Sequence, residues 1–199
     1  MAVIAFDKYG ETPLEDISGL KQKKITTRKQ LDDAESLNIN KAYLAYLVDP
    51  TKLKKVLFTL QFFQQLHHQM YHDVWTWAGE IRTVQTSIGV EAHLIRNRLY
   101  QLSDDLNYWG KAWEYQDVAT KLHHTLVYIH PFLNGNGRWS RLLTEVWLLK
   151  MEKPLPSWSI MHTTDTDALR KKYIDALKSA DQKDYQPLKE FMFNKQISL

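Results

Sequence analysis

The sequence predicts a mainly α-helical fold with one small β-hairpin. Most stretches of the 199-residue chain repeat apolar side chains every three or four positions, the spacing that buries one face of a helix. Residues 80–93 lose this period and are rich in β-branched residues, which favours two short strands. Residues 130–141, the loop motif, lie between two helical stretches and bring reactive, flexible and charged residues together. We expect the helices to be the scaffold of this motif.

Length and composition suit one globular domain. The chain is 44% hydrophobic and 25% charged, ordinary values for a soluble protein with a sizeable core. A net charge of +3 and a pI near 8.9 are mildly basic, and no basic stripe dominates one element, so nucleic-acid binding is not indicated. The absence of cysteine excludes disulfides and metal–thiolate sites. We find no signal peptide and no apolar run near eighteen residues, and we expect a cytoplasmic protein with no membrane partner.

The predicted domain, residues 1–199, divides into an N-terminal segment (1–50) and a core (51–199). Glycine and proline punctuate the first 24 residues, which we expect to be irregular. Thr27-Arg28-Lys29-Gln30 has the form of a capping box, so a helix should begin near residue 28. It should end at Asp49-Pro50, because proline disfavours helical geometry in the residue before it.

Apolar spacing predicts the remaining helices of the core. Two flank the loop motif: one ends near residue 129, and the other begins within the motif, with an apolar pattern that resumes at Leu142. The others cover residues 51–72, 95–113, 165–180 and 185–194. His68 and His72 share a helix face in the first of these, but zinc needs a third ligand, so a structural pair is favoured.

The loop motif reads His130-Pro131-Phe132-Leu133-Asn134-Gly135-Asn136-Gly137-Arg138-Trp139-Ser140-Arg141. Pro131 should stop the preceding helix at His130, and Phe132 should anchor the loop in the core. Gly135, Asn136 and Gly137 reach unusual backbone angles easily, so their N–H groups can form one concavity at the start of the next helix. Such a concavity is an anion site, because unpaired N–H groups and the helix dipole both favour negative charge.

Two arginines and a histidine complete the pattern. Arg138 and Arg141 lie three apart on one face of the first helical turn, where cations are normally disfavoured unless a polyanion such as a phosphate chain sits between them. His130 would adjoin that site and is suited to take a proton from a hydroxyl near pH 7. Each feature alone has a structural explanation, as a cap, a turn or a solvated face. Together they favour transfer from a nucleotide to a hydroxyl, usually with Mg²⁺.

The loop motif resembles the core motif of Fic-domain proteins, H-P-F-x-[D/E]-G-N-G-R-x-x-R, with one departure at Asn134. Asp73 to Arg82 resembles the segment before the Fic flap. Residues similar to the C-terminal helices of the family are Tyr173 to Leu177, Ala180-Asp181 and Pro187-Leu188. The N-terminal runs Gly10 to Leu14, Ile25 to Arg28 and Leu31 to Glu35 are similar to the subgroup called mobile mystery protein B.

The resemblance implies a Fic-type helical fold and transfer of AMP from ATP, or of a related phosphate-containing group, to Ser, Thr or Tyr of a target protein. It implies that His130 is the base. It also implies nucleotide binding by Gly135, Asn136, Gly137, Arg138 and Arg141. Family enzymes usually place Asp or Glu at position 134 to hold Mg²⁺, and the uncharged carbonyl of Asn134 should hold it more weakly.

The same resemblance implies a docking segment and an inhibitory helix. The flap of the family pairs with an extended target segment by strand addition, which assigns docking to Thr86, Ser87, Ile88 and Gly89. Many members also carry an inhibitory helix whose glutamate pairs with the second motif arginine. Glu35 matches that glutamate in part, with Arg141 as the expected partner, although a solvent-facing glutamate remains the simpler explanation.

Several alternatives stay open at this level. Asn134 also fits a nucleotide-binding or partner-binding regulatory module with weak or no turnover. The subgroup resemblance and the basic pI leave a DNA-associated protein as the weakest alternative, since no groove-reading motif is found. A separate antitoxin could replace self-inhibition, and the residues do not distinguish ATP from other donors.

Overall fold

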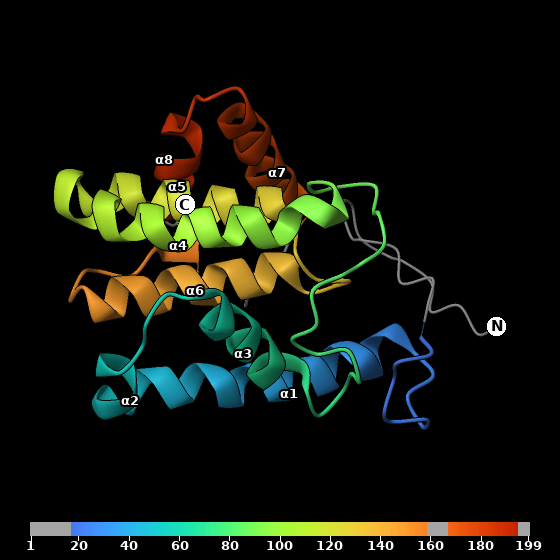
Figure 1. Cartoon of the computed structure of the whole chain (residues 1–199). Helices are drawn as coiled ribbons and strands as arrows, with labels where there is room; N and C mark the ends of the chain where they lie inside the picture. The colour runs from blue at the N-terminus through green and yellow to red at the C-terminus, as the bar shows by residue number, and fades with distance from the viewer. Residues whose placement is uncertain (1–16, 159–166, 195–199) are drawn as a thin grey trace.

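The computed structural model describes residues 17–158 and 167–194, which are mainly helical (Figure 1). The helices are α1 (Arg28–Leu47), α2 (Pro50–Lys54), α3 (Leu60–Tyr71), η1 (Ala92–Leu94), α4 (Ile95–Ala112), α5 (Tyr115–Ile129), α6 (Asn136–Lys150), α7 (Asp167–Asp181) and α8 (Gln186–Phe193). Within these described ranges the only β-type pairing is an isolated antiparallel bridge between Leu20 and Trp75. The predicted all-α class is therefore confirmed.

Helix α6 lies at the centre of the fold. It packs between α5 on one side and α3 with α1 on the other, and α7 and α8 form a helical hairpin beyond α5 (Figure 1). Its apolar side chains are joined inside the core by polar ones, Ser140, Thr144 and Glu145, so the helix is buried on most of its circumference. Because the loop motif runs into the first turn of α6, this burial fixes the motif to the core of the molecule.

The start of α1 confirms the predicted capping box. The Gln30 N–H donates to Thr27 Oγ1 at 3.3 Å, and Gln30 Oε1 accepts from the Thr27 N–H at 3.2 Å. These bonds satisfy two groups that the first helical turn leaves unpaired. The helix ends before Pro50, as predicted, and Asp49 caps the short α2 that follows.

The single helix predicted over residues 51–72 is wrong in one respect, because it is interrupted. The chain forms α2, leaves helical geometry and begins α3 with Thr59 as its N-cap, whose side chain accepts the Phe62 N–H at 3.3 Å. The predicted C-terminal helices correspond to α7 and α8, apart from residues 165 and 166, which lie outside the described residues.

The small hairpin predicted over residues 80–93 is also wrong. No strand forms there; the chain runs as a loop, which we call the flap loop (residues 83–91), and then enters η1. The carbonyls of Val84 and Val90 both accept hydrogen bonds from the buried guanidinium of Arg82, at 2.9 and 2.5 Å. A side chain therefore bridges the two arms of the flap loop where a hairpin would use backbone pairs.

Candidate functional site

The loop motif begins with a left-handed residue. His130 follows α5 with φ 52° and ψ 61°, while its N–H still donates to the Leu126 carbonyl at 3.2 Å. A residue other than glycine in this region is uncommon and costs free energy, so surrounding contacts must hold it. One such contact is the bond from Arg82 Nε to the His130 carbonyl at 2.8 Å. The strain sits at the residue predicted to be the base.

Asn136 closes the loop on itself. Its Oδ1 accepts the Phe132 N–H at 2.9 Å, and its Nδ2 donates to the Phe132 carbonyl at 2.8 Å. The side chain is almost fully buried, so both bonds are shielded from water. The amide of Asn136 is thus committed to the shape of the loop, and what residue 136 presents at the start of α6 is its backbone N–H.

Phe132 anchors the loop in the core, as predicted. Its ring is fully buried, stacks on His67 at 3.7 Å between centroids and meets the edge of Trp139 at 4.9 Å. Such aromatic contacts add to the burial of the ring itself. The two ends of the loop, at Phe132 and Trp139, therefore share one apolar anchor.

His67 is a supporting residue that sequence reasoning missed. Its Nδ1 accepts the Gly79 N–H at 2.9 Å, so Nε2 carries the proton that is donated to the Asn134 carbonyl at 3.1 Å. Burial lowers the pKa of His67 to about 3, which keeps the ring neutral and this tautomer fixed. The only signal in the sequence was a histidine on an apolar helix face, which is usually a core residue.

Gly135 and Gly137 differ in the space that surrounds them. Gly135 has φ 78°, and a Cβ placed on it would lie 2.5 Å from the ring of Tyr71, so only glycine fits. Gly137 faces open space, with nothing within 4 Å of a Cβ placed there. The N–H groups of residues 136–138 belong to the first turn of α6, which has no intrahelical partners for them. The open surface at Gly137 thus lies where an anion would be bound.

Arg138 is held by a buried carboxylate. Its guanidinium lies 2.6 Å from Glu35 Oε2, and Trp75 Nε1 donates to Glu35 Oε1 at 2.7 Å. Tyr71 lies beneath the guanidinium, with 5.4 Å between the Arg138 Cζ and the ring centroid. Burial opposes the charged form of Arg138, but Glu35 outweighs it and raises the pKa of Arg138 above its ordinary value. Glu35 is 1% exposed, so the solvent-facing explanation for it is wrong.

The partner predicted for Glu35 is corrected by this geometry. Glu35 forms its ion pair with Arg138, the first motif arginine, and not with Arg141. Arg141 lies further along α6, where its Nε donates to the Gly137 carbonyl at 3.3 Å and Tyr173 and Glu145 favour its charge. Burial nevertheless lowers the pKa of Arg141 from its ordinary value.

Asn134 is poorly placed to hold a metal. Its Oδ1 accepts the Gly135 N–H at 2.7 Å, and its carbonyl accepts from His67. No group of three or more acidic or histidine side chains suited to a metal occurs in the described ranges. A neutral oxygen already used within the loop is a weak Mg²⁺ ligand, so these residues fit a magnesium ion held by the protein poorly. His68 and His72 stack at 5.0 Å and likewise have no third ligand among the described side chains.

His130 is covered by the flap loop. Its Nδ1 is buried without a hydrogen-bond partner, and a Cβ placed on Gly89 would lie 2.5 Å from the His130 Cβ. Burial lowers the pKa of His130 to about 4, although the nearby Val127 carbonyl opposes the shift. The ring is therefore neutral near pH 7 and able to accept a proton.

The four residues predicted to dock a target lie at the tip of the flap loop. Thr86 Oγ1 donates to the Ile88 carbonyl at 2.6 Å, and the Ile88 side chain is half exposed. Gly89 has φ 97° and lies against His130. The structure thus brings this tip next to the predicted base, without the strand geometry expected for it.

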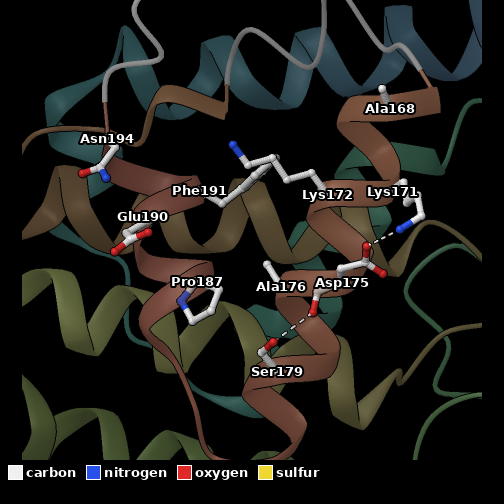
Figure 2. A pocket seen from close by; sticks show the side chains of 10 residues that line it. All are labelled: Ala168, Lys171, Lys172, Asp175, Ala176, Ser179, Pro187, Glu190, Phe191 and Asn194. Carbon is white, nitrogen blue, oxygen red and sulfur yellow. Dashed lines mark hydrogen bonds and ion pairs between the residues drawn. The ribbon is translucent and has the colours of Figure 1, made fainter.

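A separate open groove of about 650 Å³ lies between α7 and α8 (Figure 2). Charged side chains line it, among them Lys171, which pairs with Asp175 at 2.6 Å. No residue of the loop motif contributes to it.

The described helices include none long and apolar enough to cross a membrane.

Comparisons with known proteins point to one family. The family model described as "Fic/DOC family" matches residues 57–148. The protein adenylyltransferase Fic of Aedes aegypti is 28% identical over 170 residues, which cover 82% of this chain and 33% of the relative. That of Drosophila grimshawi is 27% identical over 154 residues, covering 73% and 30%. The chain thus spans about a third of the length of these curated relatives.

Solved structures share the fold. The N-terminal Fic domain of a Bartonella quintana effector with bound ADP matches with a TM-score of 0.65 at 16% identity, covering 85% of this chain and 86% of the other. The BepC protein of Bartonella tribocorum with bound AMPPNP matches with a TM-score of 0.65 at 20% identity, covering 92% and 91%. At these identities the likeness is one of fold.

Buried His67 predicts a specific dependence of stability on pH. A histidine whose pKa is lowered by folding takes up its proton first in the unfolded state, so stability falls as the pH drops from about 6.5 toward 3. Replacing His67 with Phe keeps an aromatic ring there and removes the titration. Between pH 6 and 4, the free energy of unfolding of His67→Phe should fall less steeply than that of the wild type, by about 1.4 kcal/mol per pH unit.

Urea unfolding at several pH values measures this slope. His93→Phe is the matched control, because the His93 side chain is 72% exposed, and it should keep the wild-type slope. Equal slopes for His67→Phe and the wild type would mean that His67 is protonated in the folded protein, contrary to the tautomer assigned above.

Proposed function

We propose that this chain, whose residues 57–148 match the Fic/DOC family model, transfers AMP from ATP, or a related phosphate-containing group, to a hydroxyl side chain of a target protein. One observation supports this most directly: the neutral His130 and the open first turn of α6 are joined by a short loop that Asn136 closes. The proposal also rests on the curated relatives, which are named protein adenylyltransferases.

In the proposed reaction, a Ser, Thr or Tyr hydroxyl of the target attacks the α-phosphorus of ATP. The new bond joins the hydroxyl oxygen to the α-phosphorus, the bond from that phosphorus to the bridging oxygen breaks, and pyrophosphate leaves. His130 accepts the hydroxyl proton, for which its neutral state at pH 7 is required. Positioning and charge stabilisation supply the remainder of the catalysis.

The phosphates are assigned to the start of α6. The backbone N–H groups of Asn136, Gly137 and Arg138 and the positive end of the helix dipole favour their negative charge. Arg138 and Arg141 add two guanidinium groups near this turn. Mg²⁺ that enters with the nucleotide would be bound chiefly by the phosphates, because Asn134 offers only a weak ligand.

Regulation from within the chain is part of the proposal. Glu35 holds Arg138 in a buried ion pair, so a phosphate can reach that guanidinium only by displacing the carboxylate. The N-terminal segment (1–50) would in this way restrain the core (51–199), with no separate antitoxin required. The flap loop would dock the target through Thr86, Ser87, Ile88 and Gly89.

Asn134 is the observation that favours a second candidate, a nucleotide-binding or partner-binding module with weak or no turnover. Its Oδ1 is used within the loop where the family usually has an acidic residue.

The narrower likeness to the mobile mystery protein B subgroup and the cytoplasmic location stay predictions. Gly10 to Leu14, on which the subgroup likeness partly rests, lie outside the described residues.

Intact-mass spectrometry tests the proposed transfer. Purified protein is mixed with Mg²⁺ and each nucleoside triphosphate in turn, on the expectation that a released enzyme modifies itself. Glu35→Gly should gain the mass of one nucleotidyl group with its preferred donor. Glu35→Gly combined with His130→Ala should gain none, because the proposed base is lost.

Two results would contradict parts of this proposal. An adduct that persists without His130 would mean that this residue is not the base. ATP affinity in Glu35→Gly without an adduct, even with candidate target proteins added, would favour the binding module.

Removal of Glu35 should also separate stability from activity. Glu35→Gly leaves Arg138 without its buried partner, which should lower the free energy of unfolding by about 3 kcal/mol. The same change frees Arg138 for phosphate, so ATP affinity and adduct formation should both rise. Asp33→Gly is the matched control, because Asp33 is exposed and lies two residues away on α1. This change should lower the free energy of unfolding only by the cost of glycine in a helix, about 1 kcal/mol.

Urea unfolding and calorimetric ATP titration of the three proteins measure both effects. Asp33→Gly should keep the wild-type ATP affinity. An unchanged ATP affinity in Glu35→Gly would exclude Glu35 as an inhibitor and leave it a structural residue.

A further inference from the structure

Arg82 is a buried cation that the proposed reaction does not use. Its side chain is 3% exposed and lies between the end of α5 and the flap loop. All three hydrogen bonds that the structure gives its guanidinium end on backbone carbonyls, and no carboxylate lies within ion-pair distance among the described residues. A buried charge held only by carbonyls is costly, so its position requires an explanation.

The three carbonyls belong to separate parts of the site. Nη1 and Nη2 donate to Val84 and Val90, one on each arm of the flap loop. Nε donates to His130, at the end of α5. Only the rigid fork of a guanidinium can serve three acceptors in this arrangement; the ammonium of lysine is a single point.

Backbone hydrogen bonds repeat the same connection. The Arg82 N–H donates to the Pro131 carbonyl at 2.9 Å, and the Val90 N–H donates to the Ile129 carbonyl at 3.4 Å. Both arms of the flap loop are thus bonded to the residues on either side of His130. Gly89 completes the contact, since a Cβ on it would lie 2.5 Å from the His130 Cβ and 2.9 Å from Arg82 Nη2.

The bond to His130 has a further consequence. The left-handed conformation of His130 turns its carbonyl out of the path of α5, and a buried carbonyl needs a donor. Arg82 Nε supplies that donor with a charge-assisted bond, which is stronger than a bond between neutral groups. The same side chain therefore stabilises the strained backbone of the proposed base and fixes the segment that covers it.

We propose that Arg82 is a positioning residue that couples the flap loop to His130. When a target segment displaces the loop, the Arg82 guanidinium releases the His130 carbonyl. The His130 side chain then becomes accessible together with the docking surface. This inference rests on the proposed function for its meaning, because it links target docking to the base. The coupling itself is a property of the free protein and can be measured without turnover.

The test compares Arg82→Lys and Arg82→Gln with the wild type and with Arg96→Gln, an exposed arginine on α4 that serves as the control. NMR follows the titration of the His130 ring, assigned with His130→Ala, and the exchange of the Val90 amide. Calorimetry gives the ATP affinity of each protein.

We expect both Arg82 variants to free the flap loop. The pKa of His130 should rise from about 4 toward 6.5, the Val90 amide should exchange at least tenfold faster, and ATP affinity should stay within twofold of the wild type. Because the charge of Arg82 also lowers the His130 pKa, the result for Arg82→Lys, which keeps that charge, decides this readout. Arg82→Lys should behave like Arg82→Gln, because charge without the fork does not suffice. A His130 pKa and a Val90 exchange rate that stay at wild-type values in both variants would overturn the proposal, and so would full rescue by lysine.

Gly89→Ala provides a second route if the Arg82 variants do not fold. The added methyl group presses on His130 and Arg82 from an exposed loop, with no loss of charge, and should raise the His130 pKa in the same direction. No change in that pKa would count against the coupling.

Turnover separates the two proposals. In the Glu35→Gly background, Arg82→Lys should raise kcat for adduct formation at least tenfold, because the freed flap loop no longer covers His130, and should leave the KM for ATP unchanged. Absence of any adduct in Glu35→Gly, even with candidate target proteins added, with the NMR changes present in the Arg82 variants, would refute the proposed function and uphold the coupling.

Discussion

The site depends on the two hydrogen bonds by which the Asn136 side chain brackets Phe132. They hold the ends of a tight turn together, so the departure of the chain from α5 and its entry into α6 are fixed relative to each other. The apolar anchor of Phe132 on His67 and Trp139 keeps that turn against the core. The strained angle of His130, the exposed surface at Gly137 and the position of Arg138 all follow from this closure.

Buried polar groups support the loop from each side, and each has a defined partner. His67 connects the turn at Gly79 with the Asn134 carbonyl, and Arg82 connects the flap loop with His130. Glu35 is shared between Trp75 and Arg138. Because an unpaired buried polar group is costly, these contacts favour one arrangement of the loop over its alternatives. A reaction that relies on positioning would benefit from that restriction.

The sequence was sufficient for the fold class, the main helices, the capping box at Thr27 and the resemblance to a family, because periodic apolar residues and a long motif are local signals. The family model described as "Fic/DOC family" matches residues 57–148, in agreement with that resemblance. Apart from the interrupted helix over residues 51–72, which Thr59 explains locally, the failures share a physical cause, which is contact between residues far apart in the chain. In place of a hairpin ladder, Arg82 connects the flap loop to the His130 carbonyl, 48 residues away. Glu35 on α1 pairs with Arg138 on α6, which the spacing along the chain could not show. His67 could not be told from an ordinary core histidine without its two backbone partners.

The most direct test of the central claim, that the start of α6 is a phosphate site, is ATP binding by Gly137→Ala. A Cβ at this position meets nothing in the free protein and replaces glycine in a helix, so the free energy of unfolding should rise by about 0.5 to 1 kcal/mol. A bound phosphate would meet the same methyl group, so ATP affinity, measured by calorimetry in the Glu35→Gly background, should fall at least tenfold, or about 1.4 kcal/mol. Full ATP affinity in a protein of equal or greater stability would contradict the account and place the nucleotide elsewhere.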